Sequence, residues 1–291
     1  MPITRRSYRS FEGEFRRRWR WWIVLEQELR VLNKSKIFMG LMLVALLHCL
    51  VRLLMIVAYD VVIQDPNNPF TPLLRQVHAI TVNERAFFDF LRLQSPILLI
   101  IMLFAGSGMI CNDLRNNLME VYFSKPIRWW DYAVGKFLAL VLIGLSITAI
   151  PGIFLVILHN ALVPGMETFY ESYWWPAAIT GFSLAIIIPT ALSILACSAL
   201  LRSQGYASIA VFMVLIANST FGVLLAELLR ERNYLFISYP MALNRLGQHF
   251  FLQRRLFFNL PWWWSLIYVL VITVVAGTIL IQRSRREEMA S

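Results

Sequence analysis

Six long apolar stretches constrain what this chain can fold into more than any other feature of its sequence. A helix needs about 20 apolar residues to cross the hydrocarbon core of a membrane. The chain is also 58% hydrophobic and only 15% charged, which is more apolar surface than a soluble domain of this length can bury. The sequence therefore predicts an all-α membrane protein with six transmembrane helices. The predicted spans are about 37–59, 91–111, 132–159, 177–201, 206–229 and 262–282.

The positions of the positive charges predict how these spans are oriented. Of the 27 Lys and Arg residues, 18 fall in segments on the side of the N-terminus, eight fall on the other side, and Arg52 lies within a span. Lys and Arg are enriched in cytoplasmic loops. We therefore expect a multi-pass protein of the inner (plasma) membrane, with residues 1–36 and the tail 283–291 in the cytoplasm and residues 37–282 forming the transmembrane domain. Five arginines between the fifth and sixth spans run against this rule.

Residues 11–36 have the pattern of an amphipathic helix. Apolar residues recur at steps of three and four, which draws one stripe along a helix, and basic residues lie on the opposite side. A basic helix with aromatic residues on its other face lies in the membrane surface, in contact with lipids. The alternative is a simple basic topology signal. The apolar stripe comprises Phe11, Phe15, Trp19, Trp22, Leu25, Leu29 and Leu32, and the polar side carries Arg16, Arg17, Arg20, Glu28 and Arg30.

The sequence contains no recognisable catalytic or metal-binding motif. The three cysteines are far apart and lack metal-ligand spacing. Gly135-Lys136 lacks the first glycine and the Ser or Thr of a phosphate loop, because Trp130 and Phe137 occupy those positions. We therefore expect no enzymatic activity, no metal and no cofactor bound directly by this chain. The formal charge of +10 does not favour a nucleic-acid partner, because no stacking platform or basic domain accompanies it.

His48 and Arg52 are four residues apart in the first span, so they share one helix face. Ionisable residues at membrane depth are costly and are candidates for a substrate path. The alternative for Arg52 is that its long side chain reaches toward the headgroups.

The cytoplasmic segment 111–137 predicts a compact elbow between the second and third spans. Asn112 or Asp113 can cap a short helix, and Pro126 disfavours a helical conformation of the residue before it. A second helix then starts near Arg128 and continues into the third span. A short, partly apolar helix projecting from the membrane suits the docking of a soluble partner, although an ordinary connecting loop is the alternative.

The residues of this elbow resemble the cytoplasmic elbow of ABC-2-type permeases, the membrane subunits of a class of ATP-binding-cassette transporters. The resemblance rests on Asp113, then Leu118-Met119-Glu120, Lys125-Pro126, Asp131 and Gly135-Lys136, in that order. The amphipathic helix before the first span and the six spans are similar to the family as well. Asn116-Asn117 stands where the family usually has Gly-Thr, so the first turn of the elbow departs from the family pattern.

The resemblance implies the transmembrane permease subunit of an ATP-driven exporter. Separate ABC ATPase subunits, which carry ATP-Mg, would dock on a coupling helix in the elbow, and a second permease copy or a related subunit would complete the assembly. The docking residues implied are Asp113, Leu118, Glu120, Tyr122, Phe123 and Pro126. Of these, the resemblance assigns Asp113 and Glu120 to contacts with basic ATPase residues.

The resemblance also implies short helices in the outer leaflet before the sixth span, within residues 239–258, which would hold arginines at lipid phosphates. Two other function classes stay open from the sequence. A membrane anchor or sensor could dock a cytosolic partner through the same elbow. A secondary transporter would need a broken-helix site near the membrane centre, and Pro151 and Pro189 predict breaks in the third and fourth spans.

Overall fold

The computed structural model describes residues 19–63, 81–124, 127–163, 165–253 and 261–290. Within these ranges the chain is helical and has no strand. Six helical segments are long and apolar enough to cross a membrane, which confirms the predicted all-α architecture with six spans. They are Lys36–Val62, Glu84–Arg115, Trp129–Leu162, Met166–Leu200, Gln204–Leu228 and Trp262–Met289.

The individual helices follow the spans closely. The first span is α2 (Lys36–Ile63), and the second comprises α4 (Glu84–Gly106) and α5 (Cys111–Arg115). The third comprises α7 (Trp129–Ile147) and α8 (Ala149–Leu162). The short helix α6 (Leu118–Phe123) lies between α5 and α7. The fourth comprises α9 (Met166–Ser172) and α10 (Trp175–Leu200). The fifth comprises α11 (Gln204–Phe212), the π-helical turn η1 (Met213–Ala217) and α12 (Asn218–Leu228), and the sixth is α14 (Trp262–Ala290). Before α14 come the 3-10 helix η2 (Arg232–Ile237) and α13 (Tyr239–Phe250).

The second span begins at Glu84, seven residues before the predicted start. The side chain of Asn83 caps it, because its Oδ1 accepts a hydrogen bond from the backbone N–H of Ala86 (2.9 Å). The first two turns of α4 are rich in charge, with Glu84, Arg85 and Asp89. The length of the apolar run therefore does not predict these two turns, although the capping residue Asn83 can be recognised in the sequence.

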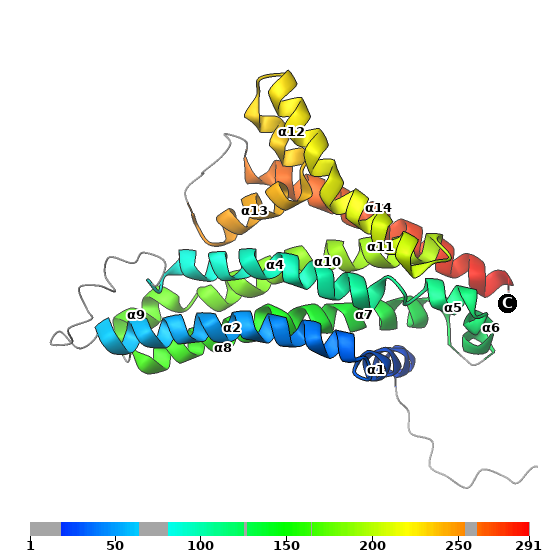
Figure 1. Ribbon diagram of the computed structural model, residues 1–291, viewed down its shortest axis with the longest axis horizontal. Helices are drawn as coiled ribbons and strands as arrows, with labels where there is room; N and C mark the ends of the chain where they lie inside the picture. The colour runs from blue at the N-terminus through cyan, green and yellow to red at the C-terminus, as the bar shows by residue number, and fades with distance from the viewer. Residues whose placement is uncertain (1–18, 64–80, 125–126, 164, 254–260, 291) are drawn as a thin grey trace, which may run out of the picture.

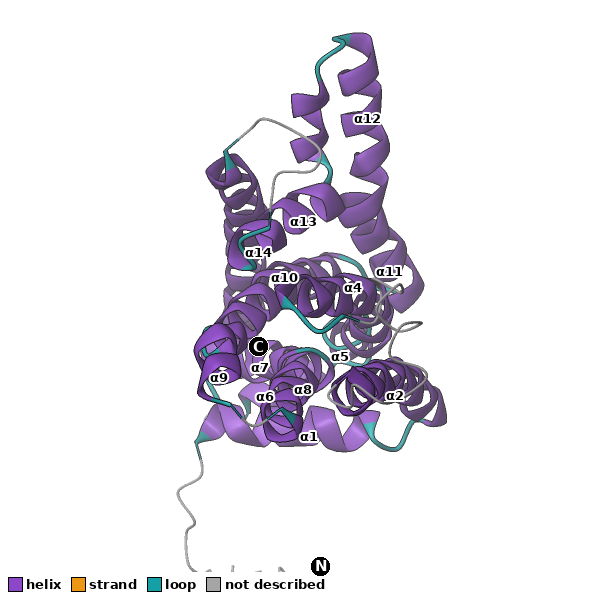
Figure 2. Cartoon of the chain, turned by 90° about the vertical axis from the view of Figure 1, so that its left-hand side faces the viewer, coloured by secondary structure: helices purple, strands orange, loops and turns teal. Residues whose placement is uncertain are grey.

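The first four spans lie side by side along the long axis of the molecule, and the fifth and sixth run obliquely to them (Figure 1). Two groups of elements gather at the opposite ends of the molecule. We call them the α6 end, where α1 (Arg20–Leu32), α5, α6 and the end of α14 lie, and the α9 end. Helix α1 is seen end-on in Figure 1 and runs across the bundle in Figure 2, so it crosses the spans at a steep angle. The hairpin of α12 and η2 projects away from the other spans (Figure 2).

The core of the bundle is α10, which packs against α4, α7, α8, α13 and α14. Its buried side chains include Ile179, Ile187 and Ile194, which are fully inaccessible. In contrast, α2 and α12 expose large apolar side chains, such as Leu43 and Leu54 on α2 and Leu228 on α12. These exposed apolar faces fit a lipid surrounding or another apolar partner.

The third span is interrupted where Pro151 was predicted to break it. A proline at position 151 cannot donate to the carbonyl of Ile147, and α7 ends at Ile147. The side chain of Gln94 from α4 replaces the missing donor, with Nε2 3.3 Å from the Ile147 oxygen. The predicted break at Pro189 is wrong, because α10 runs without interruption from Trp175 to Leu200.

The amphipathic pattern at the N-terminus does form a helix, but its packed face differs from the predicted stripe. Helix α1 begins at Arg20, and Phe15 lies outside the described residues. Val24, Leu25 and Leu32 are buried, whereas Trp19 and Trp22 are 74% and 44% exposed. The face turned toward α7 therefore holds Val24 and Leu25, and the two tryptophans remain accessible.

We expect a bulky side chain at Gly144 to destabilise the helix bundle. A Cβ atom at this position of α7 would lie 2.7 Å from Ile187 Cγ1 on α10. Overpacking of this kind costs about 1–3 kcal/mol, so Gly144→Leu should lower the thermal unfolding midpoint of the purified protein. Gly40→Leu is the matched control, because a Cβ there has no neighbour within 4 Å. Equal midpoints for the two variants would contradict the tight α7–α10 packing.

Candidate functional site at the elbow

The elbow between the second and third spans consists of two very short helices rather than one. Asn117 separates α5 from α6 and has a left-handed backbone (φ 54°, ψ 29°), a conformation that asparagine tolerates better than most residues. Neither helix has a side-chain cap, so the predicted capping role of Asn112 or Asp113 is wrong. The pair Asn116-Asn117 is therefore the turn itself.

A fully buried lysine lies directly behind this turn. The Nζ atom of Lys136, in the second turn of α7, is 2.6 Å from Glu28 Oε1 of α1 and 2.6 Å from Asp113 Oδ2 of α5. It also donates to the backbone oxygen of Met109 (2.6 Å). These contacts use all three donor positions of the ammonium group. We call Lys136, Glu28, Asp113 and Tyr132 the lysine cluster.

Tyr132 completes the lysine cluster from one turn earlier on α7. Its hydroxyl donates to Asp113 Oδ2 (2.8 Å), and Lys136 Nζ lies 4.9 Å from the centre of its ring. A buried ammonium is tolerated only when it is paired and hydrogen-bonded. The lysine cluster therefore holds α1, the end of the second span and the start of the third span to one another through a single charge.

Gly135 explains how α1 can come so close to α7. A Cβ atom on Gly135 would be 2.7 Å from the backbone oxygen of Trp21 and 2.7 Å from Val24 Cβ, both on α1. Any larger residue would push the two helices apart and lengthen the contact between Lys136 and Glu28. The Gly135-Lys136 pair thus has two linked roles, since the glycine permits the approach and the lysine bonds across it.

The C-terminal end of the chain also reaches this region. The backbone N–H of Trp129 donates to Glu288 Oε1 near the end of α14 (3.3 Å). One residue before Trp129, the backbone N–H of Arg128 donates to Asp131 Oδ2 (3.2 Å). The start of the third span is therefore fixed by its own first turn and by the last turns of the sixth span, a contact that sequence spacing could not reveal.

The predicted docking residues differ in their burial. Asp113 belongs to the lysine cluster and is 8% exposed, with its carboxylate turned inward toward Lys136. Leu118 and Glu120 are exposed on α6. Tyr122 and Phe123 are partly buried with their rings 5.3 and 6.2 Å from that of Tyr132. Burial raises the pKa of the Tyr122 phenol. Pro126 lies outside the described residues.

A groove of about 610 Å³ runs between α1 and α6. Its walls are mainly apolar, and Arg20 and Gln27 of α1 add polar groups. The exposed residues Leu118 and Val121 of α6 form the opposite wall. The groove and the α6 surface together form an accessible patch directly over the lysine cluster. Its other lining residues are Ile23, Val24, Tyr122 and Ile127.

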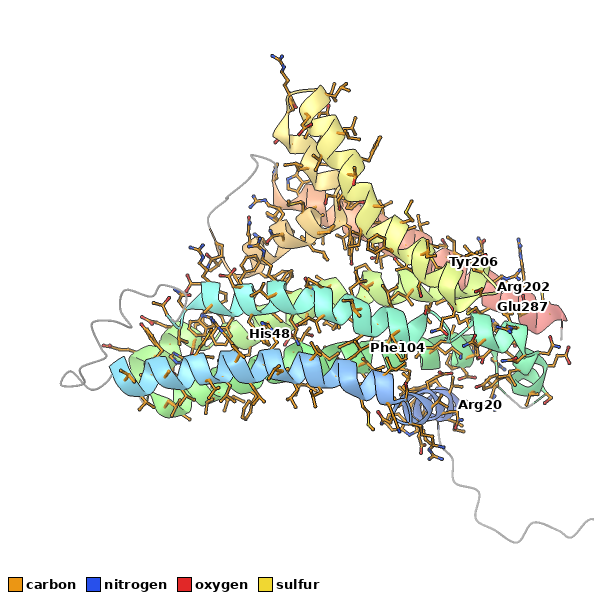
Figure 3. All side chains as sticks on the ribbon, viewed as in Figure 1. Arg20, His48, Phe104, Arg202, Tyr206 and Glu287 are labelled. Atoms are coloured by element: carbon orange, nitrogen blue, oxygen red, sulfur yellow. The ribbon has the colours of Figure 1, made fainter. Side chains whose placement is uncertain are left out.

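The two residues predicted for a substrate path both face α4, but in different surroundings. His48 Nδ1 is hydrogen-bonded to Gln94 Oε1, and its ring stacks on Phe90 at 5.4 Å. Figure 3 marks His48 between α2 and α4. Arg52, one turn further along α2, lines an open groove between the same two helices. His48 therefore packs against α4, and Arg52, which is also half-buried, borders the groove.

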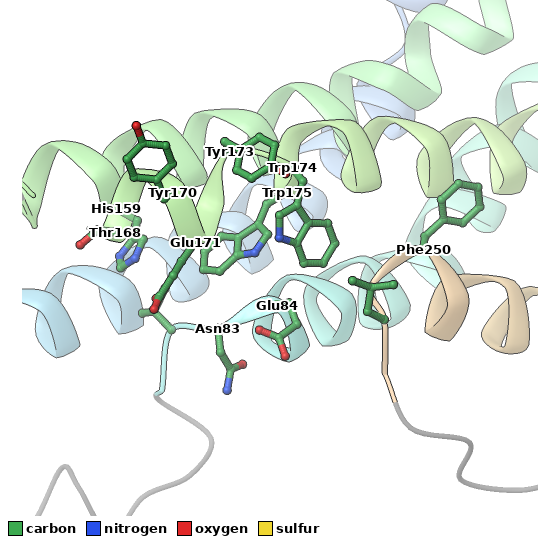
Figure 4. Close-up of a pocket in the computed structure, with 12 residues that line it drawn as sticks. Asn83, Glu84, His159, Thr168, Tyr170, Glu171, Tyr173, Trp174, Trp175 and Phe250 are labelled. Atoms are coloured by element: carbon green, nitrogen blue, oxygen red, sulfur yellow. The ribbon is translucent and has the colours of Figure 1, made fainter. Parts of the chain in front are cut away.

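A second polar pair lies at the α9 end. His159 Nδ1 is 2.7 Å from Asp60 Oδ2, and both side chains are buried. The sequence separates these residues by 99 positions, so its patterns gave no signal for the pair. His159 also stacks on Trp175 (5.8 Å) at the edge of a cavity of about 820 Å³. Figure 4 shows Glu84, Glu171 and Trp174 around the same cavity.

In the ranges that the structure describes, no three His, Cys, Asp or Glu residues are grouped to hold a metal ion.

Comparison with known families decides what kind of membrane protein carries this elbow. A family model described as "ABC-2 family transporter protein" matches residues 22–288. The chain belongs to the ABC-2 transporter family. A search of curated proteins finds no sequence that matches this permease. The match includes α1 from its third residue, the elbow and the six spans up to residue 288, and therefore contains the whole lysine cluster.

Removal of the buried lysine should destabilise the permease strongly. Lys136→Ala leaves Glu28 and Asp113 as uncompensated charges, and breaking a buried pair in this way costs about 3–5 kcal/mol. Arg30→Ala is the control, because its pair with Glu26 on the same α1 is exposed and exposed pairs contribute about 0–1 kcal/mol. Denaturant unfolding of the purified variants measures both changes. Similar losses for the two variants would show that the lysine cluster does not carry the stability assigned to it.

Proposed function

We propose that this permease is the transmembrane subunit of an ATP-driven exporter and that a separate ABC ATPase docks on the exposed face of α6. The observation that carries the proposal is the position of that face. Leu118, Glu120 and Val121 are accessible, and directly behind them the lysine cluster joins three structural elements. A force applied at α6 would thus reach α1, the second span and the third span together.

The chemistry of the patch suits a protein partner. Glu120 offers an exposed carboxylate to a basic residue, and the groove between α1 and α6 offers an apolar surface for a side chain of the partner. Small interfaces of this kind depend on a few well-packed anchors surrounded by polar residues. In this proposal ATP-Mg is bound and hydrolysed by the ATPase, and the permease contributes movement only.

The proposed mechanism is a two-state rearrangement of the spans. Closure of the ATPase dimer around ATP would shift α6, and the lysine cluster would transmit the shift to the first turns of α7. Substrate and ATP must each favour one arrangement over the other for coupling to occur. Two copies of the permease, or one copy with a related subunit, would form the pathway, with the exposed apolar faces of α2 and α12 available for lipid or for the other copy.

The proposal fixes the orientation in the membrane. The α6 end would face the cytoplasm, with both termini, and the α9 end would face outward. The excess of Lys and Arg on the N-terminal side supports this orientation. Helix α1, with accessible Trp19 and Trp22, would lie in the cytoplasmic membrane surface, and α13 would lie in the outer leaflet.

Charge reversal at Glu120 tests the docking surface. We expect Glu120→Lys to reduce co-purification of the ATPase from native membranes at least about tenfold, because a like-charge contact replaces an attraction and each 1.4 kcal/mol is tenfold in affinity. ATP hydrolysis by the isolated complex should fall in parallel. Glu167→Lys, an exposed residue of α9 at the other end, is the matched control. Wild-type co-purification by the Glu120 variant would exclude this face as the ATPase site.

Thiol labelling tests the orientation independently. In a variant without Cys49, Cys111 and Cys197, a single cysteine replaces either Leu228, which is 80% exposed at the end of α12, or the exposed Ser124 at the end of α6. A membrane-impermeant maleimide added to intact cells should label the cysteine at position 228 and not the one at 124. Labelling of position 124 alone would reverse the proposed topology.

A further inference from the structure

The cavity at the α9 end combines acidic groups with aromatic rings. Its volume of about 820 Å³ falls within the range of pockets that hold drug-sized molecules. Among the described residues that line it are two glutamates, Glu84 and Glu171, and no Lys or Arg. Aromatic side chains make up much of the remaining wall. They are Tyr170, Tyr173, Trp174, Trp175 and Phe250.

Several elements of the bundle contribute to this cavity. Glu84 is the first residue of α4, and His159 lies in the last turn of α8. Glu171 belongs to α9, Trp175 begins α10, and Phe250 ends α13. Figure 4 shows these side chains arranged around one space. A molecule in the cavity would therefore contact the second, third and fourth spans together with α13.

The two carboxylates are available to a positively charged group. Among the residues that the structure describes, the Glu171 carboxylate has no hydrogen bond or ion pair, and its side chain is exposed. Glu84 accepts a hydrogen bond from Gln253 Nε2 at 3.5 Å, which is a long contact. Arg85, next in sequence to Glu84, lines the separate groove between α2 and α4, where its Nε lies 3.8 Å from Asp89 Oδ2.

A buried histidine offers a further polar atom to the cavity. His159 is 7% exposed, and its Nδ1 is 2.7 Å from Asp60 Oδ2. Because an ionised carboxylate only accepts hydrogen bonds, Nδ1 carries the proton in this contact. The other ring nitrogen, Nε2, has no partner in the part of the chain that the structure describes. In the neutral ring Nε2 is an acceptor, so it suits an N–H group of a bound molecule.

The aromatic wall next to His159 is held in place by its neighbours. The ring of Trp175 stacks on His159 (5.8 Å between ring centres) and lies 5.1 Å from the ring of Phe87. Trp174, one residue earlier, is half-buried and lines the cavity. The face of an indole ring attracts a cation, because the ring quadrupole places negative charge there. The rings also offer a flat apolar surface, which an inorganic ion would not use.

We propose that this cavity binds an organic cation. The positive charge of the ligand lies near Glu84 and Glu171, its apolar body lies against Trp174 and Trp175, and His159 Nε2 accepts a hydrogen bond from its amino group. Carboxylates alone would accept any cation, and the aromatic wall selects one with an apolar body. The site is independent of the proposed ATPase docking, because α9 and α6 lie at opposite ends of the molecule (Figure 1).

Fluorescence anisotropy with the full-length permease, purified without an ATPase, tests the site. The probes are ethidium and fluorescein, two dyes that each have a fused three-ring frame and a pendant phenyl group but carry opposite charges. We expect saturable binding of ethidium, at least about tenfold tighter than that of fluorescein, because the carboxylates attract one dye and repel the other. Equal affinities would exclude selection by charge and overturn the proposal.

Competition with calcium chloride separates an organic cation from a metal ion. We expect calcium at the same concentration as ethidium to leave the dye bound, because calcium makes no use of the aromatic wall. Displacement of ethidium by equimolar calcium would assign the carboxylates to a metal ion and would also overturn the proposal.

The variant Glu84→Gln, Glu171→Gln removes both charges and keeps the size of the side chains. It should weaken ethidium binding roughly tenfold or more, because hydrogen bonds to charged groups are the stronger class and are worth about a factor of ten each. The control Glu167→Gln, Glu231→Gln removes the same charge at exposed positions that do not line the cavity and should bind ethidium as the wild type does. An equal loss in the control would reduce the effect to general surface charge and refute the site.

Two single variants complete the test. If the double variant does not fold, Glu171→Gln alone decides, because this side chain is exposed, and wild-type affinity for ethidium in that folded protein overturns the proposal. Trp174→Leu keeps an apolar side chain but removes the indole face, and it should weaken ethidium binding about threefold. Unchanged affinity in the Trp174 variant would show that the aromatic wall does not recognise the cation.

Discussion

The arrangement at the α6 end depends on the charge of one buried lysine. The ammonium group of Lys136 is inaccessible to solvent and is stabilised only because α1 supplies Glu28 and α5 supplies Asp113. Since an unpaired charge would be very costly in this surrounding, neither helix can move away without a replacement partner. The short helices of the elbow have little packing of their own, and the lysine cluster gives them a defined position.

The same logic applies within the bundle to the amide group of Gln94. Pro151 removes a donor from the third span, and the resulting free carbonyl of Ile147 is bonded by Gln94. Gln94 also holds His48 and donates to the Ala45 carbonyl at 3.4 Å. The first three spans thus share the amide side chain of Gln94, and the second and third spans share the ammonium group of Lys136 with α1 at the α6 end.

Sequence reasoning reached the parts of this structure that depend on local patterns. Apolar run length identified six spans, and the order of residues around Gly135-Lys136 indicated the family. Contacts between distant segments were out of reach. Glu28 was placed on the polar face of its helix, which is correct for its chemistry, but only the fold shows that this face meets Lys136. Asp113 was predicted as a possible helix cap and, by the resemblance, as a contact for a basic residue of the ATPase, and the fold shows that its carboxylate binds Lys136, 23 residues further on.

The bond between Glu288 and Trp129 joins residues 159 positions apart in the sequence. Because Glu288 is synthesised long after Trp129, the start of the third span can receive this contact only once the sixth span is in place. The elbow and the sixth span are therefore completed together, whatever the order in which the other spans pack.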